Sequence, residues 1–422
     1  MRAIVVGSGA REHALAVALA RTADVVVTPG NPGIVGVSPE GHTISSSVAP
    51  PESLDGDLVV VGPEAPLVGG LADRLRARGL AVVGPGADGA QLEGSKAFMK
   101  ELCERAGVPT ARFGVFTESA PALEFLRSLP GPYVIKTDGL ASGKGVLVTS
   151  ELAAAEADVA AKLSGTAFGP AGMRIVIEEA MSGPELSLLV LTDGQRALAL
   201  PPAQDFKRLG AGDTGPNTGG MGAYSPVPVG TDVIVDEVMA KIIEPTLTEL
   251  RRSGIAYRGV LYAGLMLTDS GPKLIEYNIR LGDPEAEVVL PLIDGDVAEL
   301  FLQTARGALP SEVKVRQGAA VCVVTAAPGY PTEPRVGQVI SGIDRAGTVE
   351  GVTVYHAGTR LREDGEIVVA GGRVLVTTAV AGTLSLARDR AYEAVDHIAF
   401  EGAQRRTDIA LDAIRAIEGT DA

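Results

Sequence analysis

The fold is decided by residues 133–146, which read Tyr133-Val-Ile-Lys-Thr-Asp-Gly-Leu-Ala-Ser-Gly-Lys-Gly-Val146. A short apolar segment ends in Lys136, a glycine-rich loop follows, and a second apolar segment starts at Gly145, which predicts two strands joined by the loop. Backbone N–H groups of such a loop can hold phosphate oxygens, and a lysine adds a point charge. We therefore expect a phosphate-binding loop with Lys136 and Lys144 beside it.

This loop differs from the Walker A loop of other nucleotide-binding proteins. Three residues rather than four separate Gly139 from Gly143, and Gly145 stands where Walker A requires Ser or Thr. The loop also leads into a strand instead of a helix. A P-loop NTPase is therefore not predicted.

Outward from the loop, the pattern predicts a small antiparallel sheet with two helices between residues 112 and 200. Asp193-Gly194 is a hairpin turn signal between the last two strands. The expected strands are 112–116, 133–137, 145–149, 174–178, 186–191 and 196–200, with helices near 119–129 and 151–163.

The first hundred residues alternate short valine-rich strands with helices, which indicates a parallel, doubly wound sheet. A further helix is expected from Lys96 to Ala106, ended by Gly107. The expected strands are Ile4–Val6, Val25–Thr28, Leu58–Val61 and Ala81–Val83, with helices at Ala14–Arg21 and Leu67–Arg78.

The region after residue 200 opens with a loop, 201–230, that is rich in Gly and Pro and has little periodicity. A loop of this length in a compact protein is usually functional or disordered, and its mix of charged and amide side chains favours function. The elements expected after it are a helix over 232–252, strands Val260–Thr268, Lys273–Ile279, Ala319–Ala326, Glu366–Ala370 and Val374–Ala379, and a helix near Ser385–Phe400.

Composition and charge exclude several classes of function. The chain has 422 residues and a formal net charge of −15, so it repels polyanions and no nucleic-acid partner is expected. It has no uninterrupted run of about 18 apolar residues, so no membrane span is expected, and its first residues are too briefly apolar for a signal peptide. Cys103 and Cys322 lie in helix-like and strand-like patterns, and we expect buried thiols of a cytosolic protein.

A second candidate site lies in Lys273-Leu-Ile-Glu-Tyr-Asn-Ile-Arg-Leu-Gly-Asp-Pro-Glu285. Residues two apart in a strand face the same side, so Glu276 and Asn278 point one way, with Ile275, Tyr277 and Ile279 opposite. A carboxylate and an amide oxygen on one face suit a hard cation such as Mg²⁺. Arg280 continues the polar face, where it would contact a transferring phosphoryl group.

Two further stretches carry weaker signals. Gly7-Ser-Gly-Ala-Arg-Glu-His13 follows the first strand and suggests an anion at a helix N-terminus, with Gly9, Arg11 and Glu12 facing a substrate. It is an incomplete dinucleotide motif, because Glu12 replaces the third glycine, and His13 is as well explained as a helix-surface group. In Arg174-Ile-Val-Ile-Glu-Glu-Ala-Met-Ser-Gly-Pro-Glu185, a backbone segment would bind an adenine edge, and the final acid would bind ribose hydroxyls.

Eight stretches occur in order along nearly the whole chain: Gly7–His13, Pro29-Gly-Asn-Pro-Gly33, Val61-Gly-Pro-Glu-Ala-Pro-Leu67, Gln91-Leu-Glu-Gly-Ser-Lys-Ala-Phe98, Lys136–Gly145, Asp213-Thr-Gly-Pro-Asn-Thr-Gly-Gly-Met-Gly-Ala-Tyr-Ser-Pro226, Leu261-Tyr-Ala-Gly-Leu265 and Glu276–Glu285. Together they resemble the phosphoribosylamine–glycine ligase (glycinamide ribonucleotide synthetase) family of the ATP-grasp superfamily. The 213–226 stretch is highly specific.

The resemblance implies a multidomain α/β and α+β protein. Its parts would be an N-terminal doubly wound α/β domain over 1–101, an ATP-grasp domain over 102–318, and a C-terminal α+β domain over 319–422. The ATP-grasp domain would consist of a small lid lobe, about 112–191, and a larger lobe, about 192–318.

The resemblance also implies site residues. Lys96 and Lys136 would bind ATP phosphates under a lid loop, Gly139 to Gly145, that includes Ser142, Gly143 and Lys144. Glu178, Glu179 and Met181 would form the adenine hinge, Glu185 would bind the ribose, and Glu276 and Asn278 would bind magnesium or manganese. Glycine and the ribosylamine would face Lys207, Asp213, Thr214, Asn217, Thr218, Gly219, Gly220, Met221, Arg280 and Asp283.

Two positions depart from the family's pattern. Phe206 stands where the family usually has histidine, which removes a polar group beside the substrate loop. Leu281 stands where it usually has phenylalanine, a change between apolar side chains that packing can absorb at small cost.

The implied reaction joins glycine to 5-phosphoribosylamine with ATP, through glycyl phosphate, in cytoplasmic purine biosynthesis. Lys136, Lys144 and Arg280 would act on the transferred phosphoryl group. Small-molecule substrates are the expected partners, and the protein is expected to be a monomer or a weak homo-oligomer. The alternatives are another ATP-grasp ligase or carboxylase of purine metabolism, a nucleotide-binding sensor without turnover, and a nicotinamide oxidoreductase.

Overall fold

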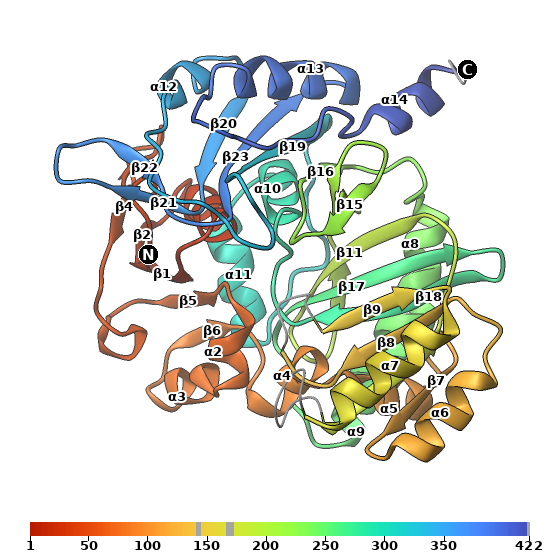
Figure 1. The fold of residues 1–422 in the computed structure, drawn as a ribbon. Coiled ribbons are helices and arrows are strands. Elements are labelled where there is room, and N and C mark those ends of the chain that lie inside the picture. The colour runs from red at the N-terminus through yellow and green to blue at the C-terminus, as the bar shows by residue number, and fades with distance from the viewer. Residues whose placement is uncertain (141–144, 166–172, 420–422) are drawn as a thin grey trace.

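The computed structural model describes residues 1–140, 145–165 and 173–419. The N-terminal part is a sheet with the strand order β3-β4-β2-β1-β5-β6, in which all neighbours are parallel except the edge pair β3–β4 (Figure 1). Its strands are β1 (Arg2–Gly7), β2 (Asp24–Pro29), β3 (Gly36–Val37), β4 (Thr43–Ser46), β5 (Leu58–Val61) and β6 (Ala81–Val83).

Both faces of this sheet are covered, which explains why its strands read as nearly continuous apolar runs. Ala3 and Val5 of β1 pack on the side of helix α1 (Ala10–Leu19), whereas Ile4 and Val6 pack with Leu75 of α3 on the other side. The predicted parallel, doubly wound sheet is confirmed.

The helix predicted over 67–78 is broken into two. Helix α2 (Glu64–Val68) ends at Gly69, and α3 (Leu71–Ala77) begins after Gly70, whose φ of +74° is a left-handed value that glycine adopts at little cost. A short 3₁₀ turn, η1 (Pro51–Ser53), precedes β5, and α4 (Ala87–Gly94) follows β6.

Helix α5 (Lys96–Ala106) has the predicted bounds. The Ser95 hydroxyl accepts a hydrogen bond from the Phe98 N–H at its start, and Gly107 ends it in the left-handed region at φ +67°. The helix leads from the N-terminal part into the centre of the molecule.

A small antiparallel sheet with two helices follows, as predicted, with the strand order β7-β10-β8-β9. Its elements are β7 (Phe113–Phe116), α6 (Ser119–Arg127), β8 (Tyr133–Thr137), β9 (Val146–Thr149), α7 (Leu152–Leu163) and β10 (Ile175–Glu179). The lobe has an apolar core of its own, formed by the two helices with Ile135, Ile175 and Ile177 of the sheet.

The last two strands predicted for this sheet belong to another one. Strand β11 (Glu185–Thr192) pairs along its whole length with β17 (Gly259–Thr268), in a sheet of order β12-β11-β17-β18 with β12 (Ala197–Ala199) and β18 (Gly271–Asn278). The prediction that residues 112–200 form one sheet is therefore wrong for 185–199. Local patterns name a strand but not its partner, because pairing here joins residues far apart in sequence.

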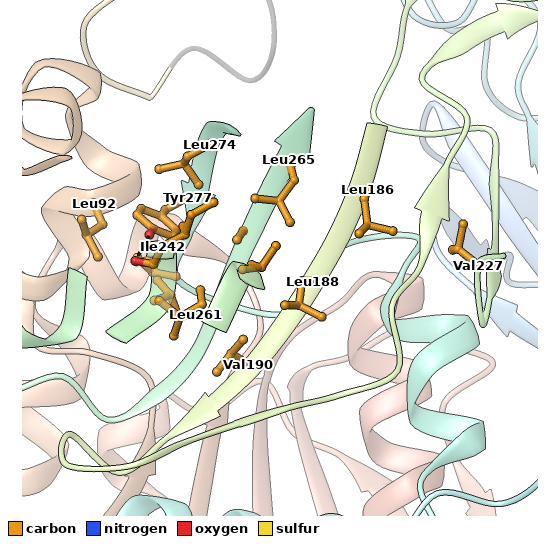
Figure 2. Close-up of a cluster of buried hydrophobic side chains, with 14 of the residues drawn as sticks. Leu92, Leu186, Leu188, Val190, Val227, Ile242, Leu261, Leu265, Leu274 and Tyr277 are labelled. Carbon is orange, nitrogen blue, oxygen red and sulfur yellow. Dashed lines mark hydrogen bonds between the residues drawn. The ribbon is translucent and has the colours of Figure 1, made fainter. Parts of the chain in front are cut away.

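The helix predicted over 232–252 is present as α8 (Asp232–Val238), a π-helical turn (Met239–Ile243) and α9 (Glu244–Arg252). These segments cover one face of the second sheet. Figure 2 shows that face, with Leu186 and Leu188 of β11, Leu265 of β17 and Tyr277 of β18 forming a continuous apolar row toward Ile242.

The segment 201–230, predicted as a loop, contains four short strands: β13 (Gln204–Asp205), β14 (Arg208–Gly210), β15 (Thr214–Asn217) and β16 (Gly222–Ser225). Strand β16 is fully buried and pairs with β19 (Ala319–Ala326) in a sheet of order β13-β16-β19-β23-β20. This segment therefore joins the C-terminal sheet and links it to the central one.

The C-terminal part lies at the top of Figure 1. Helix α13 (Leu384–Val395) covers one face of its sheet, and α10 (Ala286–Val289) contacts the sheet from the other. The remaining elements are η4 (Leu290–Leu292), α11 (Val297–Arg306), α12 (Ile343–Ala346), β20 (Val352–His356), β21 (Thr359–Leu361), β22 (Ile367–Val369), β23 (Arg373–Ala381) and α14 (Leu411–Glu418). In the part of the chain that is described, no helix is long and apolar enough to cross a bilayer.

Both cysteines are buried, as predicted. Cys103 lies in α5 and Cys322 in β19, and burial raises the pKa of the Cys103 thiol to about 12. Both therefore behave as small apolar side chains.

Two histidines join the N-terminal and C-terminal parts. The Nδ1 atom of His13 accepts a hydrogen bond of 2.9 Å from the backbone N–H of His356, and their ring centroids are 5.9 Å apart. Burial lowers the pKa of His13 to about 3 and that of His356 to about 4. His13 is therefore a buried, neutral contact between domains, and its interpretation as a helix-surface group is wrong.

The histidine contact makes folding sensitive to acid. Both rings are neutral when folded and titrate near 6.5 when unfolded, so their contribution is complete above about pH 6.5 and is lost as the pH falls toward 4. His13→Asn keeps an acceptor but cannot be protonated, so its free energy of unfolding should fall less steeply between pH 6.5 and 4, by up to roughly 1.4 kcal/mol per pH unit.

Urea unfolding at several pH values measures this difference. His397→Asn, at a half-exposed position, is the matched control and should follow the wild type. Parallel curves for His13→Asn and the wild type would contradict the assignment.

Candidate functional site

A buried charge cluster lies on the face of the small sheet that points away from its apolar core. Strand alternation places Lys136 of β8 and Glu178 of β10 on this face, as diagonal neighbours across the pair. The Lys136 ammonium lies 2.7 Å from one Glu178 oxygen, and Lys100 of α5 lies 2.8 Å from the other. Two cations around one carboxylate leave the cluster with a net positive charge, which favours an anion beside it.

The electrostatics of the cluster act on Glu178 and Lys100 through burial and through the paired charges. Burial alone would raise the pKa of Glu178, but Lys136 and Lys100 outweigh it and hold that pKa below its usual value. Burial lowers the pKa of Lys100, with Glu178 opposing the shift. Glu178 is thus the counter-ion of both lysines, and its place in an adenine hinge stays a prediction.

The start of the glycine-rich loop is attached to the N-terminus of α5. Lys96 donates a hydrogen bond of 2.9 Å to the Gly139 carbonyl, and the Asp138 carboxylate accepts bonds from the Ser95 hydroxyl and the Ala97 N–H. Three predicted loop residues lie outside the described part of the chain: Ser142, Gly143 and Lys144. Gly145 follows, where its carbonyl accepts a bond from the Thr137 N–H.

Strand β18 presents the predicted oxygen ligands on one face, and just before them it contains a feature that simple alternation does not predict. Gly264 pairs with Glu276 and Leu265 with Leu274, so Ile275 is an extra residue in a β-bulge. The bulge shifts the alternation by one residue. Leu274 and Tyr277 are both buried on one side, whereas Glu276 and Asn278 share the other, partly exposed side.

The expected common face of Glu276 and Asn278 is therefore present, but Ile275 sits in the bulge rather than beside Tyr277. Gly264 pairs with Glu276 across the strands. In the described residues no group of three or more His, Cys, Asp or Glu side chains is arranged to hold a metal. Two protein oxygens suit Mg²⁺, which fills its remaining positions with water and phosphate oxygens.

Arg280 is held by the N-terminal part. Its Nη2 donates a bond of 2.7 Å to Glu93 of α4 and one of 3.2 Å to the Asn278 side-chain oxygen, and its Nε lies 3.5 Å from Glu64 of α2. Glu93 also accepts a bond of 2.9 Å from the Ile279 N–H. One carboxylate thus fixes both the backbone and the arginine beside Asn278.

The acidic and basic residues between the sheets form a second group. The strand register places Glu185 on the same face as Glu276 and Asn278, and its carboxylate pairs with Lys207. Burial opposes the charge on Lys207, but Asp205, Glu185 and Glu276 outweigh it and raise the lysine pKa.

The two other residues predicted for an adenine hinge lie at and just after the end of β10. The Glu179 carboxylate accepts a bond of 3.0 Å from the Arg112 N–H, and Met181 is half-buried just beyond the strand. Both lie where the small sheet passes into the central one.

The predicted substrate segment 213–221 is divided between surface and core. Asp213, Thr214 and Asn217 lie on the exposed β14–β15 hairpin, and Thr218 bonds back to the Lys207 carbonyl. Met221 is fully buried, so its side chain packs inside the protein instead of facing a substrate.

Gly219 and Gly220 lie beside Asp283, where the C-terminal part contributes an arginine. Arg373 donates bonds of 2.7 Å to the Gly219 carbonyl and 2.8 Å to the Asp283 carbonyl, and it lies 3.0 Å from the Asp283 carboxylate. A Cβ atom at Gly220 would lie 2.4 Å from Pro284, so only glycine fits there.

The Gly7–His13 segment is organised around the Glu12 carboxylate. The Glu12 carboxylate accepts bonds of 2.6 Å from the Gly9 N–H and from Arg11. It fits because Gly62, at the end of β5, has no side chain: a Cβ atom there would lie 2.0 Å from it. The Gly9 N–H thus donates to Glu12, and Arg11 and Glu12 are buried partners, while their contact with a substrate stays a prediction.

Four residues of this region were missing from the predicted site: Lys100, Glu93, Arg373 and Arg406. The sequence could have indicated Lys100, because it lies four residues after Lys96 and therefore on the same face of the helix. The other three act on residues more than 80 positions away, and no local pattern reports such contacts.

Comparisons with known proteins agree along the whole chain. Three family profiles match consecutive parts: Phosphoribosylglycinamide synthetase, N domain, over residues 1–93, its ATP-grasp (A) domain over 94–286, and its C domain over 320–412. The phosphoribosylamine–glycine ligase of Caulobacter vibrioides is 48% identical and that of Streptomyces coelicolor 46%; the alignments cover 98% and 99% of this chain and 98% and 100% of those proteins.

Solved structures show the same fold. The phosphoribosylamine–glycine ligase of Thermotoga maritima superposes with a TM-score of 0.83 at 36% identity, over 97% of this chain and 100% of that one. The biotin carboxylase domain of the Hydrogenobacter thermophilus 2-oxoglutarate carboxylase gives a TM-score of 0.70 at 17% identity, over 96% and 91%, which reflects a shared fold alone.

Because Glu93 makes these contacts, removing its charge should lower the free energy of unfolding measurably. Glu93→Gln keeps the size of the side chain but leaves the part-buried Arg280 without its closest carboxylate, so the free energy of unfolding should fall by about 1–3 kcal/mol. Glu52→Gln removes the carboxylate of an exposed pair with Arg74 and should cost less than about 1 kcal/mol. Urea unfolding of both variants tests this, and equal losses would contradict the role given to Glu93.

Proposed function

The chain belongs to the phosphoribosylglycinamide synthetase family, and we propose that it joins glycine to 5-phosphoribosylamine at the expense of ATP, as in purine biosynthesis. One observation carries the proposal. Lys96 lies within electrostatic reach of both Lys136 and Glu276, so the cationic face of the small sheet adjoins the oxygen ligands of β18. A nucleoside triphosphate with its divalent ion fits this arrangement, because the lysines would face its phosphates and the oxygen ligands of β18 would face the ion.

The cationic side of this site would bind the ATP phosphates. Lys136 and Lys96 supply point charges, and Lys100 with Glu178 holds Lys136 in place. An incoming phosphate would compete with Glu178 for Lys136, which suits a lysine that must bind and release nucleotide. Glu179, Met181 and Glu185 would line the nucleoside end.

Glu276 and Asn278 would hold Mg²⁺ or Mn²⁺. When bound, the ion neutralises charge on the phosphate oxygens. Gln204 and Lys207 add support, because Gln204 bonds the Glu185 backbone and Lys207 pairs with its carboxylate, which fixes the edge of this face.

The chemistry itself needs no protein nucleophile. The glycine carboxylate would attack the γ-phosphorus, the bond to the β,γ-bridging oxygen would break, and ADP would leave with that electron pair. The ribosylamine nitrogen would then attack the carbonyl carbon of glycyl phosphate, lose a proton, and expel phosphate. The protein positions the reactants, and Arg280 would stabilise charge on the transferred group from its fixed place beside Glu93.

The wider assignments follow from this function. We place the enzyme in the cytoplasm, with small molecules as its partners. The domain limits we propose are 1–101, 102–318 and 319–422, although the sheet pairing moves the lobe boundary inside the middle domain to the start of β11 at Glu185.

Removing one metal ligand should stop turnover. Glu276→Ala leaves a single oxygen ligand, so ADP release that requires both glycine and ribosylamine should fall by at least about 100-fold. Glu237→Ala, at a half-buried position of α8 where the carboxylate pairs with Lys241, is the control and should keep wild-type turnover. Wild-type rates in Glu276→Ala would reject the metal assignment.

Substrate choice is tested by the same ADP assay, with the amine generated in situ. Release of ADP should depend on glycine, and bicarbonate or formate should not replace it. ADP release with bicarbonate instead would assign the chain to a carboxylase.

A further inference from the structure

Arg406, from the segment between α13 and α14, has every polar atom of its side chain engaged. Its side chain is 1% exposed. Nε and Nη2 donate bonds of 2.8 and 2.6 Å to the two oxygens of Asp408, and Nη1 donates bonds of 2.6 Å to Asp213 and 3.2 Å to the Arg208 carbonyl. The Cζ atom of the guanidinium lies over the Phe206 ring, 4.8 Å from its centre.

These contacts hold the chain on both sides of Lys207. Arg406 stacks on residue 206 and bonds the carbonyl of residue 208, so it fixes the backbone immediately before and after the lysine. Asp408 extends the contact by accepting a bond of 2.8 Å from the Gly212 N–H. Asp213, at φ +52°, has a strained backbone that its bond to Arg406 stabilises.

Lys207 reaches from this fixed backbone into the candidate site. Its ammonium pairs with Glu185, and Asp205 and Glu276 lie within electrostatic reach. The Lys207 carbonyl is also occupied, since it accepts bonds from the Thr218 N–H and hydroxyl. The position of the ammonium therefore depends on how firmly residues 206–208 are held.

We propose that Arg406 is a positioning residue for Lys207, through which the C-terminal part of the chain controls the site. This rests on the proposed function only in that Lys207 serves substrate binding or turnover. Phe206 contributes to this positioning, because the guanidinium packs against its uncharged aromatic ring. A lysine at position 406 would not reproduce the flat, five-donor fork.

The first experiment compares Arg406→Lys with Arg405→Lys in the ligase assay. Arg405 is the matched control: it is the neighbouring residue and bonds the Val395 carbonyl and Asp396, away from Lys207. Arg406→Lys should lower kcat/KM roughly tenfold, the size expected for losing one charged hydrogen bond. Arg405→Lys should stay within about twofold. Equal effects of the two variants would overturn the proposal.

The second experiment asks whether Arg406 acts through Lys207. In a Lys207→Met background, Arg406→Lys should have no further effect on kcat/KM, because the group that it positions is gone. Phe206→Leu, which removes the aromatic face but keeps an apolar side chain, should behave like Arg406→Lys in both backgrounds. Multiplicative losses in the double variants would show a general structural role and contradict the proposal.

A third readout does not depend on turnover. Acylation of lysines by an N-hydroxysuccinimide ester, followed by peptide mass mapping, reports how firmly the Lys207 ammonium is held. The labelling rate of Lys207, normalised to that of Lys241 in the same protein, should be several-fold higher in Arg406→Lys than in the wild type. Lys241 is a surface lysine paired with Glu237. Unchanged labelling would overturn the proposal. If labelling rises while glycine and ribosylamine give no ADP even in the wild type, the proposed function fails and the positioning role stands.

Discussion

The molecule depends on one constraint: a β-strand presents alternate residues to opposite faces, so a strand with one apolar face and one charged face can be at once structural and functional. In the small sheet, Ile135 and Ile177 enter the core while Lys136 and Glu178 face the other way. In the central sheet, Tyr277 is buried while Glu276 and Asn278 face outward. The apolar faces provide the burial that keeps the charged faces in place.

Burying charge on such faces is costly unless each group has partners, and the site shows how this is arranged. Glu178 has two cations, Glu93 accepts from an arginine and a backbone N–H, and Lys207 has three acids around it. Two of these contacts, Lys100 with Glu178 and Glu93 with Arg280, join different domains. They satisfy buried charges and also hold the domains together, as the cost of leaving a buried charge alone requires.

The C-terminal part contributes to the site without supplying the predicted nucleotide or metal ligands. Arg373 holds Gly219 and Asp283, Arg406 holds the chain around Lys207, and β16 crosses into the C-terminal sheet. The long segment 201–230 is thus ordered by its pairing with distant strands, which supports a functional role for it and explains why its own sequence shows no periodicity.

The sequence alone determined the elements that arise from local physics. Short apolar runs between helices predicted the doubly wound N-terminal sheet, and apolar segments predicted the strands around Lys136 and Glu276. A helix-like stretch ended by Gly107 predicted helix α5 to the residue, and ordered motifs predicted the ATP-grasp family. Only the tertiary structure decided that β11 leaves the small sheet, that a bulge at Ile275 puts Leu274 and Tyr277 on one face, and that Glu12 occupies the turn after β1. The same holds for Glu93, Arg373 and Arg406, whose roles come from partners far along the chain. Periodicity records which face of an element is apolar, whereas strand pairing and buried ion pairs depend on which distant segment arrives at that face.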